Sequence, residues 1–279
     1  MKTNTAKNLP LRVLKQIILI LFALIVLYPI FFVFMTSFKS NFDVISHPFG
    51  MSTFQPENYM EAWQVGKIGD YFLNSVYVTA ITLIIQMVVI VLASYSFAKL
   101  KPWGHKVLFI LFLTGLFITT EMVTVPNFST MKNLGLMDTK ISLILSLCFH
   151  RHCAGYLHCD QLYQSRCPME LDEAAIIDGC NIVQLLTKIA LPLMRPILAT
   201  IFIFNFQGAW SEFYWALIMI RSEENKTLQL GLMNFQSQFN TDYGVLTAGL
   251  VIATLPILII YLKFSSQFIG GMTVGAVKG

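Results

Sequence analysis

Charged residues are scarce in this sequence of 279 residues. Asp, Glu, Lys and Arg together supply 12% of it, whereas hydrophobic residues supply 56% and the mean hydropathy is +0.65. A typical soluble domain carries about 25% charged residues. The shortage of charge excludes an ordinary soluble enzyme, and a net charge of only +4 gives no reason to expect nucleic acid as a partner. The composition predicts an integral membrane protein.

Phosphate-binding and ion-coupling features are also missing. No Gly-x-x-x-x-Gly-Lys-Ser/Thr motif occurs, so we expect neither a nucleotide nor any other cofactor on this chain, and no catalytic residues. An ion-coupled carrier needs acidic residues in the middle of its spans. Only Glu121 and Glu212 come near an apolar run, and neither is central. Energy for any transport must therefore come from another protein.

Cysteine is rare outside one segment. Residues 146–167 hold four of the five cysteines and three of the five histidines. No Cys-x-x-Cys or His-x-x-x-His pair occurs there, so the spacing predicts no metal site. A disulfide framework is not expected at the cytoplasmic side of a membrane.

Long apolar runs dominate the rest of the chain. Residues 16–38 and 71–98 contain no charge, and each can cross a hydrocarbon core of ~30 Å at ~1.5 Å per residue. The sequence predicts an all-α polytopic membrane protein with six transmembrane helices. The predicted spans are residues 16–38, 71–98, 107–128, 140–162, 197–220 and 243–264.

Basic residues predict the orientation of these spans. Residues 1–15 carry four basic residues and no acidic one, and Lys99, Lys101 and Lys106 lie between the second and third spans, again without an acid. The loop at 39–70 mixes both signs. Because positive charge stays in the cytoplasm, we expect a cell membrane protein with both termini cytoplasmic. The other cytoplasmic segments expected are 168–196 and the tail 265–279.

A polar segment separates the fourth and fifth predicted spans. Glu173 suits the first turns of a helix, where a carboxylate favours the positive end of the dipole. Gly179 interrupts the helical pattern and allows a sharp change of direction. Ile182–Ile189 is predicted to be a second short helix, which Pro192 and Pro196 end.

The spacing of this segment, from Glu173-Ala-Ala175 through Asp178-Gly179 to Leu191-Pro-Leu-Met-Arg-Pro196, resembles the coupling loop of ABC importer permeases. The resemblance implies a short helix that seats in a cleft of a separate ATPase. The residues it marks for contact with the ATPase are Glu173, Ala174, Ala175, Asp178, Gly179, Leu191, Pro192 and Pro196.

Further motifs narrow the resemblance to maltose-type carbohydrate importer permeases. These are Asn58-Tyr59, Phe72-Leu-Asn-Ser75, Ala93-Ser-Tyr-Ser-Phe-Ala98 and Trp210-Ser-Glu-Phe213, where the family more often has Asn in place of Ser211. The resemblance implies a permease domain over residues 71–268. It also implies a C-terminal tail that reaches the ATPase, and the tail residues concerned are Gly275, Lys278 and Gly279.

This resemblance implies a transport subunit and not an enzyme. The chain would be one of two related permeases that together form a sugar path in the lipid membrane. It would couple transport through this path to an ATPase dimer that holds ATP and Mg. An extracytoplasmic sugar-binding protein would deliver the substrate. A permease for another solute, such as a polyamine or a peptide, is the alternative, because the coupling loop is widely shared.

Sugar hydroxyls need hydrogen-bond partners and aromatic faces, which a few residues within the predicted spans could supply. Helix packing or an interfacial aromatic belt explains such residues equally well. The candidates for the substrate path are Gln86, Asn205, Gln207, Trp210 and Trp215.

The Cys- and His-rich segment, residues 146–167, makes the fourth predicted span anomalous. Arg151 would lie within the bilayer, at a cost of at least ~2.5 kcal/mol near its centre. With permitted codon choices, a one-base shift of reading frame gives the apolar segment PYVSTGIVLGTYIVTNFIKAV. Two interpretations of the segment stay open: a divergent helix, or paired compensating frameshifts in the gene or in its sequencing. An inactive product of a frameshifted permease gene is therefore a further alternative for function.

Overall fold

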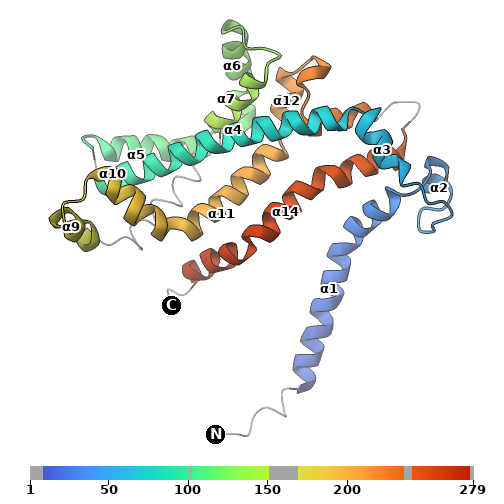
Figure 1. The fold of residues 1–279 in the computed structure, drawn as a ribbon, viewed down its shortest axis with the longest axis horizontal. Coiled ribbons are helices and arrows are strands. Elements are labelled where there is room, and N and C mark those ends of the chain that lie inside the picture. Colours follow the sequence, from blue (N-terminus) through green and yellow to red (C-terminus); the bar gives the residue numbers. More distant parts are fainter. Residues whose placement is uncertain (1–8, 101, 151–168, 236–240, 277–279) are drawn as a thin grey trace. The chain divides into compact units, whose positions relative to one another are not determined.

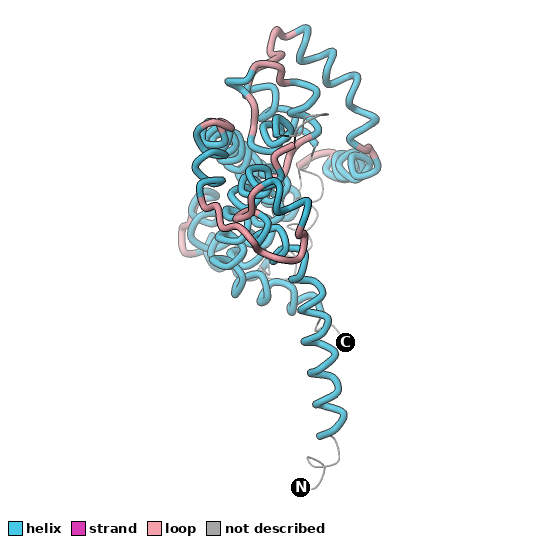
Figure 2. Tube along the Cα trace, turned by 90° about the vertical axis from the view of Figure 1, so that its right-hand side faces the viewer, coloured by secondary structure: helices cyan, strands magenta, loops and turns pink. Residues whose placement is uncertain are grey.

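A computed structural model describes residues 9–100, 102–150, 169–235 and 241–276. Within these ranges the chain consists of helices joined by turns and loops, and contains no strand (Figure 1 and Figure 2). The all-helical prediction is therefore confirmed for the part of the chain described. Residues 151–168, which include most of the Cys- and His-rich segment, and the tail residues Lys278 and Gly279 lie outside these ranges.

Four helical stretches are long and apolar enough to cross a membrane. They overlap the first, second, fifth and sixth predicted spans, so a polytopic membrane protein is confirmed, whereas the count of six stays a prediction. These stretches are Arg12–Thr36, Ile68–Leu100, Ile182–Met219 and Tyr243–Ser265.

The third predicted span is not one continuous helix. Helix α5 (His105–Thr114) continues into a 3-10 turn at Gly115–Phe117, and α6 (Thr120–Asn133) begins separately. The break has a local cause, because Ile118 and Thr119 both adopt extended backbone conformations between the two helices. Glycine at 115 weakens the helix at the same point.

The fifth span corrects one prediction, because Pro192 and Pro196 do not end a helix. Helix α10 (Ile182–Gln184) passes through a π-helical turn into α11 (Leu191–Trp210), which contains both prolines. Pro192 is the second residue of α11 and follows the π-helical turn closely. Pro196 lies further inside, and membrane helices accept such prolines because neighbouring groups compensate the missing bond.

Glu212 marks the other end of that span. Helix α11 ends at Trp210, and α12 (Tyr214–Met219) begins after a short break. The Glu212 carboxylate accepts a hydrogen bond from the backbone N–H of Trp215 at 2.7 Å. Glu212 therefore satisfies an N-terminal donor of α12, a structural role that accounts for an acidic residue in this position.

The chain divides into two compact units. Residues 1–68 and 232–254 make up the first, and residues 69–231 and 255–279 make up the second. The first contains α1 (Leu9–Thr36), α2 (Asn41–Ser46), α3 (Glu57–Gln64), the 3-10 turn Leu232–Phe235 and the beginning of α14 (Tyr243–Ala276).

Helix α1 has an apolar surface without a packed core. Every side chain from Arg12 to Phe31 is exposed in this chain. A helix that is hydrophobic all round is stable in lipid or against another membrane protein, and not in water. Membrane embedding therefore explains why so apolar a helix needs no partner within its own chain.

The Asn58-Tyr59 motif fixes the chain at the end of α1. The buried Asn58 amide donates to the carbonyls of Ser37 and Lys39 at 3.0 and 2.9 Å, and the Tyr59 and Ser37 hydroxyls lie 2.7 Å apart. Gly244 lies against the same backbone segment, and a Cβ at this position would overlap the Lys39 carbonyl oxygen. These residues hold the turn after α1 in one conformation.

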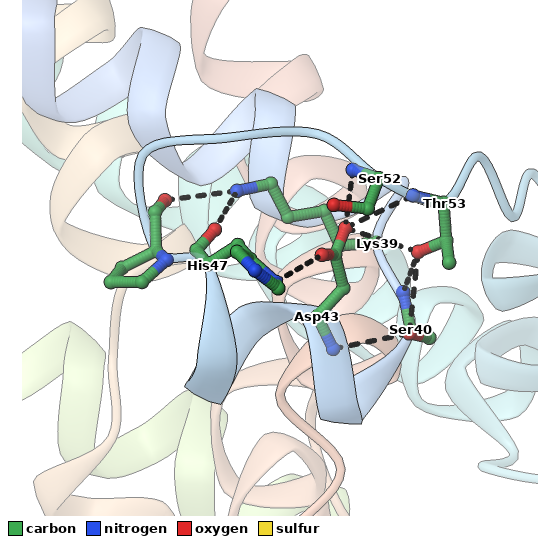
Figure 3. A network of polar contacts seen from close by, with 7 residues as sticks. Lys39, Ser40, Asp43, His47, Ser52 and Thr53 are labelled. Atoms are coloured by element: carbon green, nitrogen blue, oxygen red, sulfur yellow. Dashed lines mark hydrogen bonds and ion pairs between the residues drawn. The ribbon is translucent and has the colours of Figure 1, made fainter.

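Asp43 organises the loop that follows (Figure 3). Its buried carboxylate accepts hydrogen bonds from the backbone amides of Ser52 and Thr53 at 2.9 and 3.1 Å, and His47 Nδ1 lies 3.4 Å from its second oxygen. Burial alone would raise the pKa of Asp43, but the donors at Ser52 and Thr53 outweigh it and lower that pKa to about 2. The Lys39 ammonium donates to the carbonyls of His47 and Pro48. The loop between α2 and α3 is thus built around two buried charged side chains, Asp43 and Lys39.

The second unit contains the rest of the helices and two buried clusters. Trp215, Met219 and Leu143 belong to the first cluster, and Ile90 and Met194 belong to the second. Both draw on α4, so this long helix connects the two. The helices not yet described are α4 (Ile68–Tyr95), which continues as a π-helical turn Ser96–Leu100, then α7 (Lys140–His150), α9 (Met169–Ile177) and α13 (Leu228–Gly231).

The Phe72-Leu-Asn-Ser75 motif clamps the loop that follows α12. The Asn74 amide donates to the carbonyls of Glu224 and Lys226 at 2.8 and 2.9 Å, and the Ser75 hydroxyl accepts from the Leu228 amide at 2.8 Å. Side chains near the start of α4 therefore replace bonds that this loop would otherwise make with water.

Asp138 plays a similar part between α6 and α7. It adopts φ +61°, a conformation that Asp tolerates, and its carboxylate accepts from the backbone amides of Arg221 and Ser222 at 2.8 and 2.9 Å. Burial opposes ionisation, yet these donors hold the pKa of Asp138 below its ordinary value. The Asp138-Thr139 pair thus links two connections of the second unit.

Candidate functional site

The polar segment forms a tight helix–turn–helix whose turn depends on Gly179. Gly179 has φ +84°, and the helix α9 closes with hydrogen bonds from the Cys180 amide to the Ala175 carbonyl and from the Gly179 amide to the Ile176 carbonyl, both 2.9 Å. This is the Schellman arrangement, in which the left-handed residue is usually glycine. The predicted sharp change of direction at Gly179 is confirmed.

The second helix starts immediately after this stop. The Asn181 side chain accepts from the Gln184 amide at 2.9 Å, and the Gln184 side chain accepts from the Asn181 amide at 2.9 Å. Such a reciprocal pair is a capping box, which stabilises a helix N-terminus. The turn between α9 and α10 is consequently fixed from both sides and presents a defined shape.

One face of this turn is unusually apolar for a polar loop. Ala175 is buried, whereas Ile177 is 85% exposed, and the acidic Glu173 and Asp178 are exposed beside it. Contiguous exposed apolar side chains mark interaction surfaces. After the resemblance found in the sequence, we call this candidate the coupling-loop surface, and its members are Glu173, Ala174, Ile176, Ile177, Asp178, Gly179, Ile182 and Val183.

The remaining coupling candidates lie elsewhere. Leu191 and Pro196 are partly buried in α11, and Pro192 is exposed there, one π-helical turn beyond α10. Gly275 lies in the last turns of α14, and its partners in the tail prediction lie outside the described residues. The compact part of the candidate site therefore runs from α9 to α10.

Two polar substrate-path candidates are buried in helix packing. The Gln86 amide, 1% exposed, donates to the Leu147 carbonyl at 3.0 Å and so joins α4 to α7. Asn205 is also buried, and its amide nitrogen finds no partner among the described residues. Gln207 is exposed on α11, and Trp215 is buried in the first core cluster.

Trp210 alone among these candidates lines a cavity of about 460 Å³. Its ring packs on Phe206 with centroids 5.8 Å apart and against Phe72 at 5.4 Å. The walls come from α4, α11 and the later part of α14 and are almost wholly apolar. They consist of Val76, Thr79, Ala80, Leu83, Ile84, Met87, Phe202, Phe206, Trp210, Pro256 and Ile260.

Sequence reasoning missed one ion pair at the coupling loop. Lys99 Nζ lies 2.6 Å from the Asp172 carboxylate, and their side chains are 8% and 15% exposed. Lys99 entered the sequence argument only as a positive charge that orients the helices. The available clue was that Lys99 and Asp172 carry opposite charges and both lie in predicted cytoplasmic segments. They are 73 residues apart (172 − 99), however, and nothing in the sequence gave a reason to pair them.

Comparison with known proteins places this architecture in a family. The profile of the family described as "Binding-protein-dependent transport system inner membrane component" matches residues 161–267. Those residues include the whole turn from α9 to α10 and both of the apolar stretches Ile182–Met219 and Tyr243–Ser265.

Two relatives match over nearly the whole chain. The probable ABC transporter permease protein YurM of Bacillus subtilis is 36% identical over 264 residues, covering 94% of this chain and 87% of the relative. The diacetylchitobiose uptake system permease protein NgcG of Streptomyces coelicolor is 31% identical with the same coverage of both.

A solved structure confirms the fold. One chain of a bacterial ABC transporter involved in the import of alginate superposes with a TM-score of 0.83 at 22% identity, covering 96% of this chain and all of that one. The helical arrangement is thus shared at a distance where the sequence has largely diverged. From the identity to its relatives over almost its full length, the chain belongs to the permeases of binding-protein-dependent ABC transporters, multi-pass inner membrane components that lack an ATPase domain.

Proposed function

We propose that this chain forms, with a second permease, the membrane path of a sugar or oligosaccharide importer. The 31% identity to a diacetylchitobiose uptake permease carries this proposal, and the resemblance of its motifs to maltose-type permeases supports it. An ATPase dimer that holds ATP and Mg would drive the cycle, and an extracytoplasmic binding protein would deliver the sugar.

The coupling-loop surface is the proposed contact with the ATPase. Ile177 and its exposed apolar neighbours lie on a turn whose shape is fixed by Gly179 and by the Asn181–Gln184 capping box. A rigid, apolar surface bordered by carboxylates suits a protein partner with a hydrophobic cleft and basic rim. The tail residues Gly275, Lys278 and Gly279 are proposed to add a second contact.

Six spans with cytoplasmic termini complete the proposal. The ion pair between Lys99 and Asp172 supports the orientation, because it joins the basic connection after α4 to the coupling loop. Both segments then belong on one side of the membrane, as the distribution of basic residues predicts.

The subunit prediction is tested by reconstitution. Vesicles that contain this chain alone should accumulate no labelled diacetylchitobiose or related oligosaccharide with ATP present, because the chain supplies no nucleotide site. Adding the second permease, ATPase and binding protein encoded beside it should produce uptake that requires ATP hydrolysis. Accumulation by the isolated chain under an ion gradient would instead identify a secondary carrier, and uptake of a polyamine or peptide in place of sugars would reassign the substrate.

The docking prediction concerns Glu173. Glu173→Lys should weaken co-purification of the ATPase about tenfold, since a reversed charge meets the basic rim proposed for the partner. Pull-down from detergent extracts at two salt concentrations measures it. The matched control is Glu61→Lys, which reverses the charge of an exposed glutamate on a different helix, α3. It should leave co-purification unchanged. Equal recovery of the ATPase with both variants would remove Glu173 from the interface.

A further inference from the structure

The ion pair between Lys99 and Asp172 joins the coupling loop to the end of α4. Lys99 lies in the π-helical turn Ser96–Leu100, and Asp172 lies in α9. The two charged atoms are 2.6 Å apart, and both side chains are largely shielded from solvent. Removing either member of a shielded pair is costly, because the other charge is left uncompensated.

A second connection holds the other side of the same loop. Tyr95 and Ala98, just before Lys99, belong to the buried cluster that includes Ala190 and Met194. Those two residues follow α10, whereas Asp172 precedes the turn. The segment that follows α4 therefore contacts both sides of the coupling loop. It forms an ion pair with α9, and its apolar side chains pack against residues beyond α10.

Lys99 lies in a departure from regular α-helix. π-Helical turns are rare and are frequently found at functional sites. Here the turn directly follows α4, which ends at Tyr95, and it contains the residue that pairs with Asp172.

Helix α4 also lines the cavity that contains Trp210 in its wall. Val76, Leu83 and Met87 of α4 contribute to the walls around Trp210. Because α4 passes without a break into the π-helical turn that contains Lys99, we expect a displacement at Lys99 to reach the cavity-lining residues of α4. The loop and the cavity are in this way joined by one helical stretch, Ile68–Leu100.

We propose that Lys99 and Asp172 are positioning residues that transmit movement of the coupling loop to α4 and so to the cavity. This inference rests on the proposed docking of the loop on the ATPase. It makes α4, and not only α11, which follows the loop directly in sequence, a moving part of the transport cycle.

The test measures coupling in the complete complex in proteoliposomes, using the oligosaccharide that the wild type transports best. Lys99→Met and Asp172→Asn should each lower the number of sugars moved per ATP hydrolysed at least fivefold, with ATPase co-purification retained. Lys99→Arg and the exchanged pair Lys99→Asp with Asp172→Lys should restore at least half of the wild-type ratio. The matched control is Lys106→Met, an exposed lysine in the same connection, which should change nothing.

A covalent link tests the inference without the two charges. In a cysteine-free background, Lys99→Cys and Asp172→Cys joined by a short bismaleimide should transport better than the unlinked variant, because the link restores the joint movement that the ion pair is proposed to provide. No gain of transport on linking, or wild-type ratios in Lys99→Met and Asp172→Asn, would overturn the inference. Failure of the proposed function is distinguishable, since the wild-type complex itself would then show no ATP-dependent sugar uptake.

Discussion

Gly179→Val is expected to abolish sugar uptake while leaving the amount of protein in the membrane unchanged. The glycine has φ +84°, and no atom lies within 4 Å of the position a Cβ would take, so the substitution meets no steric clash. Its whole effect is backbone strain, of about 1–3 kcal/mol for a left-handed branched residue. That strain would release the stop at the end of α9 and misplace Glu173. Transport assays and membrane immunoblots on the same vesicles measure both quantities.

Two matched variants distinguish the effect of backbone strain itself from the effect of its location in the coupling loop. Gly135, in the turn after α6, has φ +68° and equally open surroundings, so Gly135→Val carries the same strain outside the coupling loop and should retain uptake. Gly179→Asn should retain most of it, because Asn tolerates the left-handed region. Normal uptake by Gly179→Val would show that the turn geometry is not needed for coupling.

Replacing residues 146–167 with the apolar segment of the shifted reading frame is expected to raise membrane yield and assembly with the ATPase several-fold. The replacement removes Arg151, Asp160 and Arg166 from the predicted fourth span and supplies a continuous hydrocarbon-compatible helix. Yield of purified protein per cell mass and ATPase co-purification are the measurements.

The first residues of the segment, 146–150, make contacts that a second variant should preserve. Ser146 accepts a hydrogen bond from the Asn127 amide at 2.8 Å, and Leu147 is buried in the first core cluster. A second version that keeps residues 146–150 and replaces only 151–167 preserves these contacts and should give the higher yield of the two. Unchanged yield in both, with codons that confirm the written residues, would make the Cys- and His-rich stretch genuine, and zinc analysis of the protein would follow.

The sequence predicted those features that depend on neighbouring residues. Charge-free runs identified the long apolar helices, and Gly179 between two helical patterns identified the turn, because a left-handed residue is a local requirement. Local rules failed at Pro192 and Pro196, where a π-helical turn and the surrounding helices accommodate the missing N–H groups. The break within the third predicted span was equally hidden, since nothing in the sequence at Ile118 and Thr119 reveals an extended backbone.

Contacts between distant segments lay beyond sequence reasoning. The Phe72-Leu-Asn-Ser75 motif could be matched to a family, but only the structure shows that Asn74 and Ser75 clamp the loop after α12. The substrate-path candidates show the same limit. Gln86 is a polar residue in a span, and nothing in the sequence distinguishes a sugar ligand from the bond to the Leu147 carbonyl that it makes.

Asp43 has a consequence for the acidity in which the transporter can work. A carboxyl whose pKa is about 2 when folded and 3.8 when unfolded stabilises the fold fully above pH 3.8, and that contribution disappears as the pH falls through 2. The loop between α2 and α3, which the distribution of basic residues predicts to lie outside the cytoplasm, therefore keeps this charge in mildly acidic media. Its shape is accordingly insensitive to a change of pH over that range.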